Sequence, residues 1–117
     1  MALVAETLLI LRSKRGTNVN ISSVARRKTF PIHTAYVGTK FAVHGLSEKL
    51  REELSTHNVR VVTIAPGAAE TDLLSHKTDQ RIKTGYEAWK TEMGGKVLAA
   101  EDMANAVYYA YAQPAGV

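Results

Sequence analysis

The sequence predicts an α/β fold with an open parallel sheet, and three observations lead to this prediction. Helical and strand-like patterns alternate along the 117 residues, as they do where helices connect parallel strands. Residues 60–65 form a β-branched run that Pro66 and Gly67 end, which indicates a strand followed by a turn. Residues 35–56 carry the longest helical pattern, because apolar side chains recur there at intervals of three to five.

The elements before these two continue the alternation. Residues 2–12 predict a helix, since they are good helix formers with leucines at helical spacing. The first strand is predicted at residues 18–22, where Val19 and Ile21 alternate with polar residues. The stretch that ends at Pro31 shows no clear period, and we expect a loop there.

Two more helices are predicted after the second strand. Residues 68–77 have loop character, and a helix at residues 79–93 follows, closed by two glycines. Within it, Tyr86 and Trp89 are more typical of side chains that anchor a helix than of substrate contacts. The last helix is predicted at residues 99–112, with two acidic residues in its first turn, where the helix dipole favours them.

The predicted sheet is incomplete. Two parallel strands do not make a sheet that is stable alone. The chain also begins inside a predicted helix and stops at residues 114–117, where another strand would be expected. We therefore expect residues 1–117 to be one part of a single larger domain that lacks its N-terminal strands and its last strand.

Composition and charge argue against several other classes of protein. The absence of Cys excludes disulfides and thiolate metal sites, and the four His residues have no metal-site spacing. No apolar run approaches the roughly 18 residues of a membrane span, and residues 8–11 lack the flanks of a signal peptide. The net charge of +4 collects in clusters at residues 12–15 and 26–28 without interleaved aromatic residues, so solvated loops are favoured over nucleic-acid binding. We expect a cytoplasmic protein without a metal site.

Tyr36 and Lys40 are the first candidate catalytic residues. They lie four positions apart at the start of the long helix, so both project from one face. An ammonium beside a phenol favours the phenolate, as general acid–base catalysis requires. Ser23 follows the first strand and Pro66-Gly67 follows the second. Ligands of open parallel sheets bind outside the carboxyl ends of the strands, so all of these groups are predicted to meet at one site.

Three segments resemble the second half of a short-chain dehydrogenase/reductase, namely Asn20-Ile-Ser-Ser-Val24, Tyr36-Val-Gly-Thr-Lys40 and Pro66-Gly-Ala-Ala-Glu-Thr71. In this order they match the N-x-S-S strand end, the Y-x-x-x-K helix start and the P-G-x-x-x-T loop of that family. Ser23 lies thirteen residues before Tyr36, the usual family spacing, which selects Ser23 over Ser22. The resemblance implies a Rossmann-like, doubly wound parallel sheet.

The resemblance also implies an NAD(P)-dependent oxidoreductase that transfers a hydride between the cofactor and an alcohol or carbonyl substrate. Tyr36 would be the acid/base, Lys40 would bind the nicotinamide ribose, and Ser23 would bind the substrate oxygen. The implied cofactor-binding residues are Tyr36, Lys40, Pro66, Gly67, Ala69 and Thr71. Similarity of the C-terminal residues to NADP-dependent bacterial relatives favours NADP, although NAD stays open. Relatives form dimers or tetramers through the helix equivalent to residues 35–56, which implies a homo-oligomer for the full-length protein.

Several family features have no counterpart in the sequence. These are the glycine-rich turn G-x-x-x-G-x-G, the residue that selects NAD or NADP, the N-N-A-G segment and the fourth catalytic residue, an Asn. The alternative interpretation is therefore a catalytically incompetent fragment whose helices serve only oligomer association.

Overall fold

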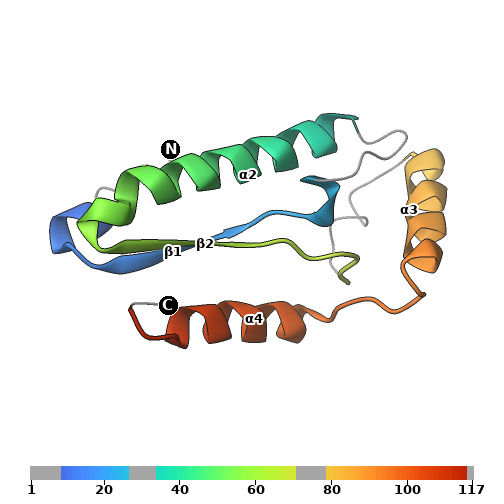
Figure 1. Cartoon of the computed structure of the whole chain (residues 1–117). Coiled ribbons are helices and arrows are strands. Elements are labelled where there is room, and N and C mark those ends of the chain that lie inside the picture. The colour runs from blue at the N-terminus through green and yellow to red at the C-terminus, as the bar shows by residue number, and fades with distance from the viewer. Residues whose placement is uncertain (1–8, 27–33, 71–78, 116–117) are drawn as a thin grey trace.

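The computed structural model describes residues 9–26, 34–70 and 79–115. In chain order its elements are β1 (Gly16–Ile21), the 3₁₀ turn η1 (Val24–Arg26), α2 (Thr34–Leu54), the 3₁₀ turn η2 (Ser55–His57), β2 (Val59–Ile64), α3 (Gln80–Glu92) and α4 (Ala100–Ala112). The two strands form a parallel sheet, with α2 along one face and α4 along the other (Figure 1). The predicted α/β order and the parallel pairing are confirmed.

The two strands end together, which places the segments that follow them side by side. They pair in register over their whole length, and the last pair is Ile21 with Ile64. The pairing continues past this point, because the Ser22 N–H donates to the Ile64 carbonyl at 2.7 Å and the Val24 N–H donates to the Pro66 carbonyl at 3.0 Å. The turn after β1 and the Pro-Gly turn after β2 are therefore fastened to each other.

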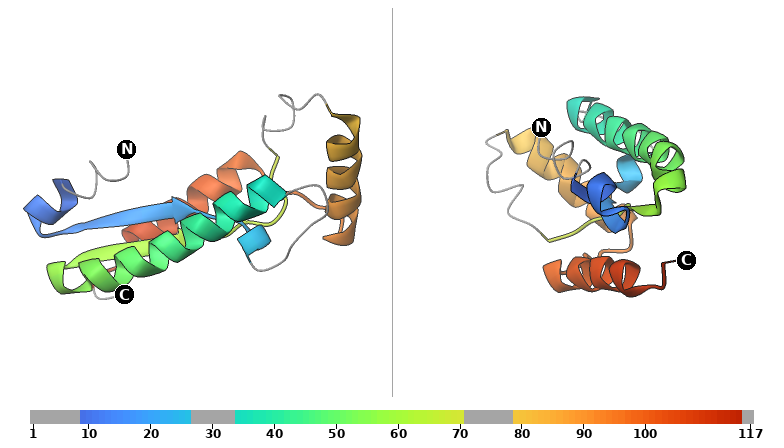
Figure 2. Two further views of the ribbon diagram at one scale, coloured as in Figure 1. Left: turned by 90° about the horizontal axis from the view of Figure 1, so that it is seen from above. Right: turned by 90° about the vertical axis from the view of Figure 1, so that its left-hand side faces the viewer.

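The hydrophobic core lies between α2 and the sheet. Leu54, Val59 and Val61 are buried together there, and partly buried apolar side chains of Ile10, Leu11 and Leu50 pack against them. Seen from above, α2 runs along the strands (Figure 2). Phe41 and Leu46 belong to the apolar pattern that predicted this helix, yet they are 45% and 48% exposed. The elements packed most closely on α2 are the strands and the 3₁₀ turns, which leave these two side chains uncovered.

The element boundaries differ from the prediction by one or two residues. Residues 9–12 of the helix predicted at 2–12 are helical, and its other residues lie outside the described part. β1 begins at Gly16, earlier than predicted, because Lys14 turns the chain with φ 51° directly after the helical turn. The predicted helix at 35–56 ends as α2 at Leu54 and tightens into η2. Asn58, with φ 56°, then turns the chain into β2, a conformation that Asn tolerates well.

α3 stands at the carboxyl ends of the strands, and α4 returns along the sheet (Figure 1). As predicted, two glycines follow α3, and both have left-handed φ values, 92° at Gly94 and 72° at Gly95. A parallel bridge between Ala69 and Leu98 joins the loop after β2 to the segment between the two helices. The sequence did not predict this bridge, because a single pair of residues leaves no periodic pattern.

Candidate active site

Two buried serines follow β1. The Ser22 hydroxyl donates to the Lys40 carbonyl of α2 over a long 3.4 Å, so it helps to join the strand to the helix. The Ser23 hydroxyl instead accepts a hydrogen bond from the Ala25 N–H at 3.1 Å. This contact orients the Ser23 oxygen within the turn, and it leaves the proton of the hydroxyl as a donor. Ser23 is only 4% exposed, so almost all of its side chain is buried in this turn.

Lys40 connects α2 to the end of β1. Its Nζ donates to the Ile21 carbonyl at 3.3 Å, two residues before Ser23. The same Nζ lies 5.7 Å from the centroid of the Tyr36 ring, within the range of a cation–π contact. Tyr36 is 38% exposed, so ligands can reach its phenol. The structure thus brings Tyr36 and Lys40 together and places their pair beside the strand end that leads to Ser23.

The loop after β2 lies at the same edge. Pro66 is fastened to the turn after Ser23, as described above. Gly67 lies against Met93, because a Cβ atom at this position would stand 2.5 Å from the Met93 Cε. Any larger residue at Gly67 would displace the end of that methionine side chain. Thr71, the last of the predicted cofactor-binding residues, lies outside the described part of the chain.

Tyr86 of α3 also contacts this loop, although the sequence favoured a helix-anchoring role for it over a contact in the pocket. Its hydroxyl donates to the Ala69 carbonyl at 3.1 Å. Its ring packs against Trp89 with centroids 5.4 Å apart, and the Lys90 Nζ lies 5.7 Å from its centroid. Burial is the main cause that raises the pKa of Tyr86; Lys90 opposes this shift, whereas Tyr36 adds to it. The spacing of Tyr86, Trp89 and Lys90 puts them on one helical face, but it gives no signal for the contact with Ala69.

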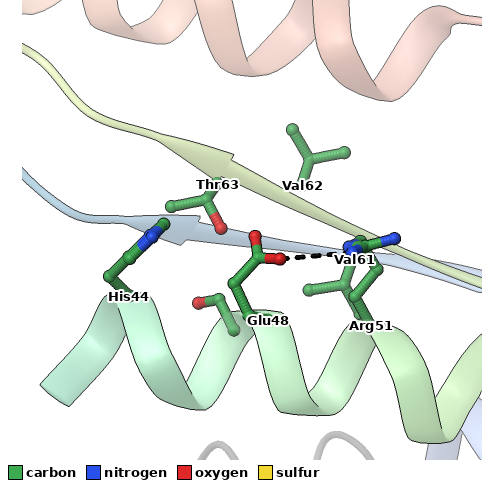
Figure 3. Close-up of a pocket in the computed structure, with 7 residues that line it drawn as sticks. His44, Glu48, Arg51, Val61, Val62 and Thr63 are labelled. Atoms are coloured by element: carbon green, nitrogen blue, oxygen red, sulfur yellow. Dashed lines mark hydrogen bonds and ion pairs between the residues drawn. The ribbon is translucent and has the colours of Figure 1, made fainter.

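A hollow of about 550 Å³ lies elsewhere, between α2 and β2. Its lining consists of His44, Ser47, Glu48, Arg51, Val61, Val62 and Thr63 (Figure 3). Glu48 and Arg51 pair with each other at 3.2 Å, and the Ser47 hydroxyl is engaged by Asn20 and Val43. None of the predicted site residues lines this hollow, and its charged groups compensate each other. We therefore take the strand ends as the candidate active site.

The described residues contain neither a metal-binding cluster nor a helix that could span a membrane. Within residues 9–26, 34–70 and 79–115, no three His, Asp or Glu side chains are grouped so that they could hold a metal ion. Among the helices described, none combines the length and apolar character that crossing a membrane requires.

Comparison with known proteins identifies the family. The family model for short chain dehydrogenases matches residues 1–82. The chain belongs to this family. An uncharacterized oxidoreductase of Staphylococcus saprophyticus is 32% identical to this chain over 105 residues, which are 88% of the chain and 41% of that protein. Serine 3-dehydrogenase of Agrobacterium fabrum is 33% identical over 104 residues, which are 89% of the chain and 41% of that protein.

Solved structures of the family agree with the fold. The closed form of serine dehydrogenase complexed with NADP+ matches this chain with a TM-score of 0.74 and 27% identity, over 92% of the chain and 43% of that protein. The predicted Rossmann-like α/β fold with parallel strands is thereby confirmed for the part that the chain contains. The chain spans about two-fifths of the length of these relatives.

Proposed function

We propose that residues 1–117 are the catalytic part of an NAD(P)-dependent oxidoreductase that interconverts alcohols and carbonyl compounds. The observation that carries this proposal is the pairing of Tyr36 and Lys40 at the strand ends, 5.7 Å from ammonium to ring centroid. Membership of the short-chain dehydrogenase family supports the assignment to an oxidoreductase. The assignment of roles to individual side chains is our proposal.

Each of the three side chains has a distinct role in the proposed reaction. Tyr36 donates a proton to the substrate oxygen during reduction and takes one back during oxidation, which its exposed phenol permits. Lys40 places its ammonium 5.7 Å from the centroid of the Tyr36 ring, where it can bind the ribose hydroxyls of the cofactor. Ser23 donates a hydrogen bond to the substrate oxygen and stabilises the negative charge that develops there. When bound, the nicotinamide cofactor supplies or accepts the hydride.

The residues at the strand ends fit the nicotinamide end of such a cofactor. The Lys40 ammonium is a hydrogen-bond donor for ribose hydroxyls, and residues 66–69 offer backbone groups at the same edge of the sheet. The Ala69 backbone continues this surface toward α3. We propose NADP as the cofactor, with support from the related serine dehydrogenase that was solved as a complex with NADP+. Thr71 completes the proposed set of contacts from outside the described residues.

A hydride-transfer assay tests the proposal. The protein is incubated with NADPH and a panel of carbonyl compounds, or with NADP+ and a panel of alcohols, and the absorbance of reduced nicotinamide is followed. We expect Tyr36→Phe to lower the turnover by about 100-fold or more, because it removes only the proton-transferring hydroxyl. Tyr109→Phe is the matched control, since Tyr109 is 70% exposed on α4. Equal turnover of Tyr36→Phe and Tyr109→Phe would contradict the proposed role.

A second candidate function is association through α2 without catalysis. The exposed Phe41 and Leu46 on this helix favour it, because uncovered apolar side chains gain free energy when a partner buries them. The expected occupant is a second copy of this chain, as in a homo-oligomer. Sedimentation of the wild-type protein and of Leu46→Glu distinguishes the two candidates. An oligomer that dissociates in Leu46→Glu, without any binding of NADP(H) by the wild type, would favour association alone.

A further inference from the structure

The loop after β2 is hydrogen-bonded on two sides, and the bonds on each side involve different backbone groups. On one side the Leu98 N–H donates to the Ala68 carbonyl at 2.9 Å, and the Glu70 N–H donates to the Leu98 carbonyl at 2.8 Å. On the other side Tyr86 donates to the carbonyl of Ala69, the residue between them. In an extended segment, successive peptide groups point to opposite sides. The N–H and the carbonyl of Ala69 therefore face away from Leu98.

α3 is fixed against this loop at a second position. Met93, just after the last turn of the helix, lies against Gly67, seven residues after Tyr86. Because Tyr86 in the middle of α3 and Met93 directly after α3 contact the same loop, the placement of the helix does not depend on the Tyr86 hydrogen bond alone. The Tyr86 ring also packs against Trp89, with centroids 5.4 Å apart, and the Lys90 Nζ lies 5.7 Å from its centroid. This packing limits the positions that the hydroxyl can take.

The Tyr86 hydroxyl acts as a donor at this position. Burial raises its pKa, so the neutral, proton-bearing form is favoured. A carbonyl oxygen has two lone pairs, and the bond from Tyr86 uses one of them. The second lone pair and the Ala69 N–H together form an acceptor and a donor on one residue. A primary carboxamide carries the complementary donor and acceptor.

We propose that Tyr86 is a positioning residue, whose hydroxyl holds the Ala69 carbonyl in the orientation that binds the carboxamide of the nicotinamide ring. This inference rests on the proposed function, because it takes the strand ends as the nicotinamide site. Tyr86 acts through Ala69 and takes no part in proton transfer.

Two ligands that differ in one group test this inference. NADPH carries the carboxamide, whereas its 3-acetylpyridine analogue has a methyl group in place of the amide nitrogen and cannot donate to Ala69. Binding is followed by quenching of Trp89, the single Trp of the sequence, which lies 5.4 Å from the Tyr86 ring. The proteins compared are the wild type, Tyr86→Phe and the exposed control Tyr109→Phe, with circular dichroism as the check on folding.

We expect Tyr86→Phe to raise the Kd of NADPH by about three- to ten-fold, the usual effect of one lost hydrogen bond. The Kd of the acetylpyridine analogue should stay within about two-fold of the wild-type value, because this ligand does not use the second lone pair. Tyr109→Phe should bind both ligands like the wild type. The wild type itself should prefer NADPH to the analogue, a result that does not depend on the folding of any variant.

Each other outcome overturns the inference in a recognisable way. An equal loss of affinity for both ligands would show that Tyr86 merely supports the fold. Unchanged or tighter binding of NADPH by Tyr86→Phe would show that the hydroxyl has no role or competes with the cofactor. A wild type without preference between the ligands would exclude the carboxamide contact. If the wild type binds neither ligand, the proposed function fails as well, which separates that case from the others.

Discussion

Ser47 is the residue through which the attachment of α2 to β1 can be measured. It is 1% exposed. Its hydroxyl accepts a hydrogen bond from the Asn20 side chain at 2.9 Å and donates one to the Val43 carbonyl at 2.7 Å. Ser47→Ala would leave the Asn20 amide without this acceptor between helix and sheet. Such an unpaired group costs about 1–3 kcal/mol, and the better helix propensity of Ala offsets at most about 0.5 kcal/mol.

We therefore expect Ser47→Ala to lower the free energy of unfolding by about 1–2.5 kcal/mol. The assay is urea unfolding followed by circular dichroism, in which a slope of about 1–3 kcal/mol per M makes the midpoint fall by on the order of 0.5–2 M. Ser55→Ala is the matched control. The Ser55 hydroxyl also donates to a carbonyl of the preceding turn, that of Glu52, but Ser55 is exposed. Its replacement should change the stability by no more than about 0.5 kcal/mol.

The hydrogen bond between Asn20 and Ser47 can also be tested with a double variant. Asn20→Ala and Ser47→Ala remove the same hydrogen bond, so the double variant should lose clearly less stability than the sum of the single losses. Equal stability losses for Ser47→Ala and Ser55→Ala, or strict additivity with Asn20→Ala, would refute the reasoning. The same contact also maintains the position of Lys40 against β1, because Lys40 lies two helical turns before Ser47.

Three other predictions concern the core, α4 and the behaviour in alkali. Leu54→Ala should lower the free energy of unfolding by about 2–5 kcal/mol, since Leu54 is buried in the core. Leu46 is exposed, so Leu46→Ala should lie within about 0.5 kcal/mol of the wild type. Similar losses of stability for the two variants in urea unfolding would contradict this placement of Leu54 in the core. Arg60→Met should speed hydrogen exchange in α4 and leave α2 unchanged, because the Arg60 guanidinium donates to three backbone carbonyls at the C-terminal end of α4. Exchange rates in α4 that are the same in Arg60→Met and in the wild type would contradict this prediction. The free energy of unfolding should fall as the pH rises above about 10. Burial raises the pKa of Tyr86 in the folded protein, so above this pH the unfolded chain releases the Tyr86 proton while the folded protein keeps it. Tyr86→Phe should show a shallower fall in urea unfolding over this pH range, and identical slopes would disprove this assignment.

Local patterns were sufficient to predict most of the fold. The β-branched run at residues 60–65 and the helical period at residues 35–56 each depend on neighbours in sequence, and both elements form at those places. The spacing of Tyr36 and Lys40 predicted a shared helical face for the same reason. The ends of the elements were less predictable, because turns such as the one at Asn58 depend on a single left-handed residue.

Contacts between distant segments could not be predicted in this way. Tyr86 reaches Ala69 only because the Ala69–Leu98 bridge and Met93 bring α3 to the loop after β2. Asn20 and Ser47 are 27 residues apart, and no periodic pattern links a strand residue to one particular helix position. The exposure of Phe41 was also unpredictable, because an apolar period does not reveal how much of a helix face its neighbours cover.

The most direct test of the central claim is the transfer of a labelled hydride. The protein is given NADPH with deuterium at the transferable position of the nicotinamide, together with a carbonyl substrate that the panel assay identifies, and the alcohol product is analysed by mass spectrometry. We expect the product of the wild type and of Tyr109→Phe to carry the deuterium, and Tyr36→Phe to form little or no labelled product in the same time. An unlabelled product, or equal labelling by Tyr36→Phe, would contradict hydride transfer with Tyr36 as the acid/base.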